Sequence, residues 1–257
     1  MSKEISKEMN KDMNRNMNKN TRCENYREFF NKEYLMGPNS LQLLDEMLTK
    51  YPLKEGVRVL DLGAGRGITS MFMAKEAKVD VFAAELWISP TENAKAFEKW
   101  GVADRVIPMK VDANEMPFAE DYFDAIVSID AFHYFANEKN YFQDKILPYI
   151  KKGGVAIIAM PSLEKAIDGP IPELLLEWFE GDEGEMNLFH TREQWLEILG
   201  DNKGYEVVMD FDMECFDEAW NDWFESGHKY GIKDKEFFDR GLRDYLSFVG
   251  LVIRRKE

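Results

Sequence analysis

The chain has 257 residues, of which 45% are hydrophobic, and a formal net charge of −15 at pH 7. This composition supplies a core of ordinary size and excludes wholesale disorder. The acidic surplus argues against a nucleic-acid partner, because such binding depends on Lys and Arg at phosphates. No apolar run approaches the ~20 residues that cross a bilayer, and no secretory signal is visible. Two cysteines are too few for a disulfide framework or a thiolate metal site. We therefore expect a cytoplasmic protein without a metal.

The first segment, residues 1–21, is a low-complexity extension in which basic residues and methionines recur every four residues. That spacing places each set along one side of a helix. Asparagine is a poor helix former, and no cap encloses the tract. We interpret it as a flexible extension, with a helix that contacts a partner as the alternative.

Residues 22–53 are expected to form a helical lid. The i, i+4, i+8 spacing of Tyr26, Phe30 and Tyr34 predicts an aromatic stripe on a short helix. A stripe of this kind either packs in a core or closes over a ligand. Residues 40–53 predict a second, amphipathic helix.

Residues 54–257 alternate between apolar strands and helices, which predicts an α/β fold with a largely parallel sheet covered on both faces. An acidic insertion at about 162–190 interrupts the alternation and is expected to cap an acceptor pocket. Its charge is either an ordinary solvated surface or a field that attracts a cationic substrate. The expected strands are 58–62, 80–85, 105–111, 123–129, 155–160, 205–211 and 245–253. The expected helices include 68–76, 89–100, 141–150 and 191–199. A turn at Gly153-Gly154 leads into the strand at 155–160, and a capping box from Thr191 to Gln194 starts the helix at 191–199.

Ligands of such sheets bind beyond the carboxyl ends of the strands. The first expected strand ends in a glycine-rich turn, DLGAGRG, where glycine lets the backbone approach a ligand. The dinucleotide fingerprint is G-x-G-x-x-G, and here the third glycine comes one residue early. Asp61 at the start of this turn repels a pyrophosphate and attracts an ammonium group. The turn therefore favours S-adenosylmethionine over NAD.

Carboxylates also end the next two strands. Glu85 ends the second strand, where it can accept hydrogen bonds from both hydroxyls of a ribose. Asp112 follows the third strand and either accepts from the amino group of an adenine or is an ordinary turn residue. The Ala113 amide can donate to a ring nitrogen, and Leu86 and Trp87 can flank the purine. Together these residues predict an adenosine-binding edge of the sheet.

Four stretches, VLDLGAGRG, FAAELW, VDANEMPFAEDYFDAIVSIDAFHYF and ILPYIKKGGVAIIAMP, resemble the motifs of class I S-adenosylmethionine-dependent methyltransferases. EYLMGPNS and FHTREQW are similar to the small-molecule enzymes of the ubiquinone-biosynthesis type. The resemblance implies a Rossmann-like, doubly wound seven-stranded sheet with an antiparallel last strand. It also implies S-adenosyl-L-methionine as cofactor and S-adenosyl-L-homocysteine as product. The cofactor-binding residues expected here are Tyr34, Asp61, Gly63, Ala64, Gly65, Gly67, Glu85, Leu86, Trp87, Asp112, Ala113, Ser128 and Ile129.

The candidate catalytic residue is His133, which lies just beyond the fourth expected strand. An imidazole titrates near neutral pH and suits a general base for an acceptor that starts as O–H, S–H or N–H⁺. The alternative is a histidine that holds this loop or only lines the acceptor pocket. The apolar residues of the cap suit a lipid-like or aromatic acceptor, and its acid suits an amine.

The sequence thus predicts a methyltransferase that moves a methyl group from S-adenosylmethionine to a small molecule by in-line displacement. Three alternatives are a dinucleotide oxidoreductase, a binding module that keeps the cofactor site without methyl transfer, and an enzyme that uses the cofactor for other chemistry such as cyclopropane formation. The sequence specifies neither the acceptor nor the oligomeric state.

Overall fold

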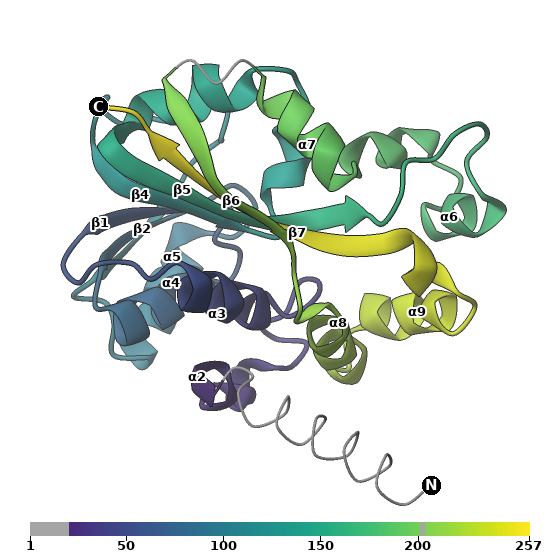
Figure 1. The fold of residues 1–257 in the computed structure, drawn as a ribbon. Coiled ribbons are helices and arrows are strands. Elements are labelled where there is room, and N and C mark those ends of the chain that lie inside the picture. Colours follow the sequence, from purple (N-terminus) through teal and green to yellow (C-terminus); the bar gives the residue numbers. More distant parts are fainter. Residues whose placement is uncertain (1–20, 201–203) are drawn as a thin grey trace, which may run out of the picture.

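The computed structural model describes residues 21–200 and 204–257, so the extension expected over residues 1–21 lies almost wholly outside the described residues. Figure 1 shows one sheet with helices on both faces. Its seven strands have the order β3-β2-β1-β4-β5-β7-β6. The pairs from β3 to β5 are parallel, and β7 runs antiparallel to both β5 and β6. The predicted Rossmann-like sheet with an antiparallel last strand is therefore confirmed.

The strands agree closely with the alternation expected from the sequence. They are β1 (Arg58–Leu62), β2 (Asp80–Glu85), β3 (Val106–Lys110), β4 (Phe123–Ile129), β5 (Ile150–Leu163), β6 (Tyr205–Asp212) and β7 (Leu246–Arg255). The α-helices are α2 (Thr21–Glu24), α3 (Ser40–Lys50), α4 (Ile68–Phe72), α5 (Pro90–Lys99), α6 (Glu173–Trp178), α7 (Arg192–Leu199), α8 (Phe216–Glu225) and α9 (Lys229–Phe238).

Local sequence signals explain where several of these elements begin. The Ser89 side chain accepts a hydrogen bond from the Thr91 amide and starts α5, with Pro90 at its first turn. Thr191 and Gln194 form the predicted capping box that starts α7. None of the described helices is long and apolar enough to cross a membrane.

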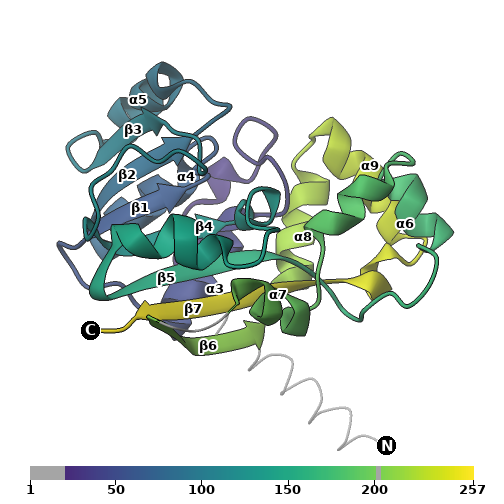
Figure 2. The same cartoon turned by 90° about the horizontal axis from the view of Figure 1, so that it is seen from above.

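The sheet is buried on both faces by two hydrophobic clusters. Val59 of β1 belongs to the cluster under α3, α4, α5 and α8, and the neighbouring Leu60 belongs to the cluster under α7. This alternation follows from the period of two in a strand. Figure 2 shows α6, α8 and α9 gathered beyond the carboxyl ends of the parallel strands. Elements from the second half of the chain therefore lie beyond this edge of the sheet.

The aromatic stripe predicted over residues 26–34 does not form, because this segment folds into short turns with one 3₁₀ turn at Arg27–Phe29. Tertiary contacts override the helical spacing. The Tyr26 hydroxyl donates to Glu76 at 2.6 Å, and the Phe29 ring, outside the predicted stripe, packs edge-on to Tyr34 with centroids 5.1 Å apart. The helix expected over 40–53 ends at Lys50, and both its apolar and its polar faces are buried from Leu41 to Leu48.

The segment that leads into β5 also differs from the structure expected from the sequence. The helix expected over 141–150 is a π turn at Phe142–Ile146 followed by a 3₁₀ turn at Leu147–Tyr149, and β5 begins at Ile150. The predicted turn at Gly153 and Gly154 is an irregularity inside β5, where its register with β4 shifts. A Cβ on Gly154 would lie 2.7 Å from the Asp124 carbonyl oxygen, so this site requires glycine.

Candidate functional site

Two adjoining cavities lie at the carboxyl ends of the parallel strands. The first, of about 280 Å³, is lined by residues 62–66 after β1, 84–87 after β2, 111–114 after β3 and 129–131 after β4. The second, of about 690 Å³, lies between the end of β4 and helices α6, α8 and α9. Residues that line both cavities form their junction, and they are Met36, Gly37, Pro38, Asp130 and Tyr134.

The glycine-rich turn after β1 is built for close packing as well as for a ligand. Gly63 has φ +83°, and a Cβ on it would lie 2.3 Å from the Ala131 side chain. Gly67 has φ +78°, and its Cβ would lie 2.5 Å from the ring of Phe97 on α5. Gly63 lines the first cavity, whereas Gly67 does not. The structure therefore places Gly67 against α5 and not at the ligand contact expected for it.

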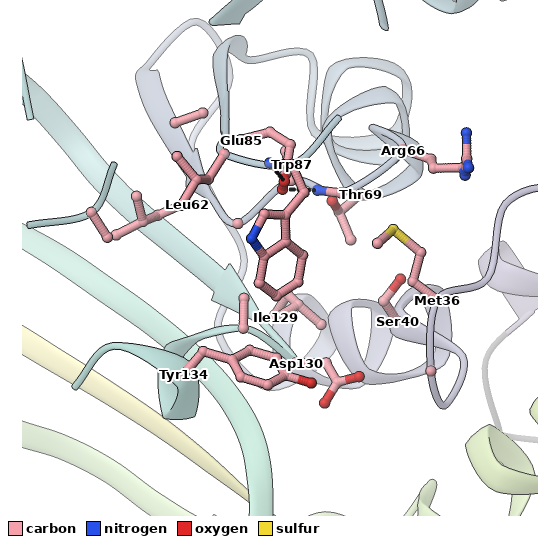
Figure 3. A pocket seen from close by; sticks show the side chains of 18 of the residues that line it. Met36, Ser40, Leu62, Arg66, Thr69, Glu85, Trp87, Ile129, Asp130 and Tyr134 are labelled. Carbon is pink, nitrogen blue, oxygen red and sulfur yellow. Dashed lines mark hydrogen bonds between the residues drawn. The ribbon is translucent and has the colours of Figure 1, made fainter. Parts of the chain in front are cut away.

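Glu85 holds the glycine turn to the end of β2. Its side chain is buried, with one carboxylate oxygen accepting from the Gly65 amide at 2.8 Å. The other oxygen accepts from the Trp87 amide at 2.6 Å and from the Ile88 amide at 3.3 Å. Figure 3 shows this carboxylate beside the Trp87 side chain. The acid expected to bind a ribose therefore also fixes the backbone around it.

Asn93, which was not among the residues expected from the sequence, completes this clamp from the opposite side. Its buried Nδ2 donates to the Gly65 carbonyl oxygen at 3.0 Å, while the Gly65 amide donates to Glu85. The signal available in the sequence was an asparagine on the core-facing side of α5, where a polar group must find a partner.

Asp61 lies beneath the turn rather than in the cavity. It is 1% exposed, and its Oδ2 accepts hydrogen bonds from the Thr69 hydroxyl at 2.7 Å and the Ser70 hydroxyl at 2.6 Å. Burial raises the pKa of Asp61 to about 6, and the charge of Glu85 adds to the shift. Thr69 lines the first cavity and Asp61 does not. Asp61 therefore affects the cavity indirectly, by orienting the hydroxyl of Thr69.

Ser128 is the other expected contact outside the cavity lining. Its hydroxyl is buried and donates to the Leu62 carbonyl oxygen at 2.8 Å, which ties β4 to β1. The remaining expected cofactor residues line the first cavity: Tyr34, Gly63, Ala64, Gly65, Glu85, Leu86, Trp87, Asp112, Ala113 and Ile129. Asp112 is also a turn residue, because its Oδ1 accepts from the backbone and side-chain nitrogens of Asn114.

Asp130 and Tyr134 dominate the junction, and neither was singled out from the sequence. Asp130 follows β4 in a left-handed conformation with φ +54°, and its amide donates to the Ala159 carbonyl oxygen at 2.7 Å. Burial raises the pKa of Asp130 to about 7. Tyr134 lies with its ring 5.7 Å from that of Trp87, and Figure 3 shows the Tyr134 side chain next to Asp130 with the Trp87 indole above them. An acid that directly ends a buried strand was the available signal.

His133 lines the second cavity and not the first. It is 3% exposed, and burial lowers its pKa to about 3, so the imidazole is neutral at pH 7 and a weak base. Within residues 21–200 and 204–257, its Nδ1 is buried without a hydrogen-bond partner. The structure thus places the candidate catalytic histidine in the wall of the second cavity. No group of three metal-ligating side chains occurs in the part of the chain that the structure describes.

Comparison with known proteins agrees with this geometry. Residues 59–154 match a family model described as a methyltransferase domain. A 27-O-demethylrifamycin SV methyltransferase from Amycolatopsis mediterranei is 32% identical over 95 residues, which are 36% of this chain and 35% of that protein. A sarcosine/dimethylglycine N-methyltransferase from Aphanothece halophytica is 29% identical over 109 residues, 41% of this chain and 38% of that protein.

Among solved structures, phosphoethanolamine N-methyltransferase 2 of Haemonchus contortus, in complex with S-adenosyl-L-methionine, superposes with a TM-score of 0.70 at 19% identity. The match covers 91% of this chain and 57% of that one. This chain spans little more than a third of the length of the curated relatives it matches. The matched region contains the glycine turn, Glu85 and Asp130. Residues 59–154 thus match a methyltransferase domain, and the chain shares its fold with this S-adenosyl-L-methionine-bound methyltransferase.

Proposed function

We propose that the protein transfers a methyl group from S-adenosylmethionine to a small molecule held in the second cavity. The observation that carries this proposal is the pair of cavities that meet at Asp130 and Tyr134. An adenosine-binding edge lies on one side of the junction, and a larger chamber lies on the other. In-line transfer needs two sites that face one another in this way.

The residues of the first cavity fit S-adenosylmethionine by their chemistry. Glu85 and Asp112 present carboxylates at the ends of adjacent strands, suited to ribose hydroxyls and an adenine amino group. Asp130 adds a third acid, and Arg66 is the basic side chain that lines this cavity in the described part of the chain. Three acids against one base disfavour a pyrophosphate and suit a ligand that carries an ammonium and a sulfonium.

When bound, S-adenosylmethionine supplies a methyl group already activated on a positively charged sulfur. The protein's own tasks are therefore alignment and the exclusion of water. Trp87 and Tyr134 supply aromatic cover at the junction, and Met36 faces them from the segment before α3 (Figure 3). Both curated relatives carry names of enzymes that methylate small molecules, one at oxygen and one at nitrogen. A small-molecule acceptor in the second cavity is consistent with both.

Calorimetric titration with S-adenosylmethionine, S-adenosylhomocysteine and NAD tests the cofactor. We expect the two adenosyl ligands to bind the wild type and Glu92→Ala, an exposed acid on α5, with similar affinity, and to bind Glu85→Ala at least about a hundredfold more weakly. Binding of NAD alone contradicts the proposal. Transfer of isotope-labelled methyl groups to a panel of small amines, alcohols and acids then tests the reaction, and binding without transfer to any of them favours the partner-binding alternative.

A further inference from the structure

The second cavity combines aromatic walls with a strong excess of negative charge. Five acids line it, Asp130, Glu180, Asp182, Glu185 and Asp234, against the single cation Lys233 among the described residues. Lys233 forms an ion pair with Glu180, so it leaves the other acids uncompensated. The chamber therefore disfavours an anionic ligand and favours a cationic one.

Asp234 shows that the aromatic walls are held in fixed positions. Its two carboxylate oxygens accept hydrogen bonds from the indole nitrogens of Trp178 on α6 and Trp223 on α8, each at 2.8 Å. Asp234 lies on α9, so one carboxylate joins three helices around the chamber. Ordered indole rings beside acidic groups are a setting in which a cation binds through ring faces and charge together.

Two buried nitrogen atoms indicate that the chamber receives a polar ligand rather than a lipid tail. His133 and Trp220 are 3% and 5% exposed, and both line the cavity. In the described ranges the Nδ1 of His133 and the Nε1 of Trp220 are buried without a partner. A buried donor or acceptor that lacks a partner is costly. A polar ligand group that reached these atoms would reduce that cost, whereas an alkyl chain would not.

Asp130 is the charged residue at the place where the two cavities meet. Burial is the cause that raises its pKa, and no ion pair or side-chain hydrogen bond from residues 21–200 or 204–257 offsets the cost of its charge. A positively charged group placed at the junction would supply the missing partner. On the proposed function, the junction is also where the methyl group and the acceptor atom meet, because it joins the two cavities.

We infer that the acceptor is an amine, with its nitrogen at Asp130 and its body among the aromatic side chains of the second cavity. This inference rests on the proposed function. An ammonium nitrogen first gives one proton to the Asp130 carboxylate, which frees a lone pair. The new N–C bond forms from that pair while the C–S bond breaks and its electrons stay on sulfur. The product nitrogen then carries the positive charge, and Asp130 returns the proton to solvent.

The test uses three probes with the same ring and different charge: 2-phenylethylamine, 2-phenylethanol and 3-phenylpropanoate. Their affinities are measured by calorimetry on the full chain saturated with S-adenosylhomocysteine. We expect the amine to bind at least about tenfold more tightly than the alcohol, and the carboxylate to bind most weakly. Asp130→Asn should remove the amine's advantage, because the amide carries no charge and tolerates the left-handed conformation.

Asp121→Asn is the matched control. Asp121 also has a left-handed backbone, with φ +54°, but it lines neither cavity. We expect this variant to keep the preference for the amine. Equal affinity for amine and alcohol, binding of none of the probes, or an amine preference that persists in Asp130→Asn overturns the inference. Because S-adenosylhomocysteine binding is measured first, its absence would identify a failure of the proposed function instead.

Discussion

The two cavities are built in different ways, although they meet at the same residues. The first is formed largely by the ends of four neighbouring strands, and backbone atoms hold its acids: Glu85 accepts from three amides, and Asp112 accepts from the Asn114 amide. The second is assembled from α6, α8 and α9 around side chains such as Asp234, which bonds residues 11 and 56 positions away. The first cavity is a local product of the sheet, and the second depends on long-range packing.

This difference has a functional consequence. A cavity held by strand ends and backbone hydrogen bonds has little freedom to change, which suits a cofactor of fixed shape. A cavity held by side chains from separate helices changes when any one helix changes. On the proposed function, variation in the second cavity would alter the acceptor while the cofactor site stays the same.

The strongest test of the rigid first cavity is Gly63→Ala. The new Cβ would lie 2.3 Å from that of Ala131, in a backbone conformation that already disfavours alanine. We expect a loss of about 3 kcal/mol in the free energy of unfolding, with loss of S-adenosylhomocysteine binding. Urea unfolding and calorimetry measure the two effects. Gly56→Ala is the matched control, because Gly56 has φ +75° and nothing within 4 Å of its Cβ position.

Gly56→Ala should cost only about 1 kcal/mol, the strain of the left-handed backbone alone. Equal effects of the two substitutions would show that contact with Ala131 does not restrain the glycine turn.

Asp61→Asn tests whether the buried acid under the turn is a cost to the fold. The pKa of Asp61 is raised from 3.8 to about 6, so the folded state holds its proton more tightly than the unfolded state. The tighter proton binding therefore adds to the free energy of unfolding. This stabilisation is complete below pH 3.8, and about 3 kcal/mol of it is lost as the pH rises through 6. The amide oxygen can still accept from Thr69 and Ser70. We therefore expect Asp61→Asn to gain stability relative to the wild type between pH 4 and pH 8.

Chemical unfolding of both proteins at several pH values measures this difference. Asp124→Asn is a control with the opposite sign, since hydrogen bonds from Lys151 and the Arg58 amide lower the pKa of Asp124 despite its partial burial. It should lose stability at neutral pH. A pH-independent difference between Asp61→Asn and the wild type would contradict the raised pKa.

Most of the residues expected at the cofactor site line the first cavity together, because the signals for them in the sequence are local. A strand, a glycine turn and an acid at the next strand end lie within residues 58–85, and the parallel register alone brings them together. Two of the expected residues lie outside the lining of this cavity. Gly67 and Ser128 have residue types suited to ligand contact, but packing against Phe97 and a bond to the Leu62 carbonyl occupy them.

The second cavity was beyond prediction in its particulars. Three of its acids, Glu180, Asp182 and Glu185, lie in the acidic insertion expected from the sequence, but their meeting with Trp220 and Trp223 depends on how α8 and α9 close over the sheet ends. No periodicity within one segment encodes that contact. The same reason explains the turns at residues 26–34, where bonds to Glu76 and to the Ser226 carbonyl replaced the predicted helix.

A smaller effect should follow Glu85→Gln, which keeps the shape of the clamp and removes half of its acceptors. A glutamine amide has one acceptor oxygen, so it can serve the Gly65 amide or the Trp87 and Ile88 amides, but not both. We expect S-adenosylhomocysteine to bind about tenfold more weakly, with little change in the unfolding midpoint. Calorimetry decides, with Glu92→Gln as control. Unchanged affinity would mean that backbone clamping does not support the cofactor site.

The smallest expected effect tests whether a change in the second cavity leaves ligand binding in the first cavity unchanged. Trp220→Phe removes one indole N–H that has no partner among the described residues and keeps an aromatic ring in the second cavity. Because an unpaired buried donor is costly, we expect the free energy of unfolding to rise by up to ~1 kcal/mol. S-Adenosylhomocysteine affinity should stay within about twofold of the wild type, since Trp220 does not line the first cavity.

Trp195→Phe is the matched control, because its indole N–H donates to the Pro161 carbonyl oxygen at 3.3 Å. That substitution leaves the Pro161 carbonyl oxygen without this hydrogen bond, so it should lower the free energy of unfolding by about 1 kcal/mol, whereas Trp220→Phe should raise it. Denaturant titration compares the two proteins directly. If both variants lose stability alike, the Trp220 Nε1 already has a hydrogen-bond partner, and it gives no support for a polar ligand in the second cavity. If Trp220→Phe weakens S-adenosylhomocysteine binding severalfold, the cavities are coupled through the junction at Asp130 and Tyr134, and the acceptor chamber cannot vary independently of the cofactor site.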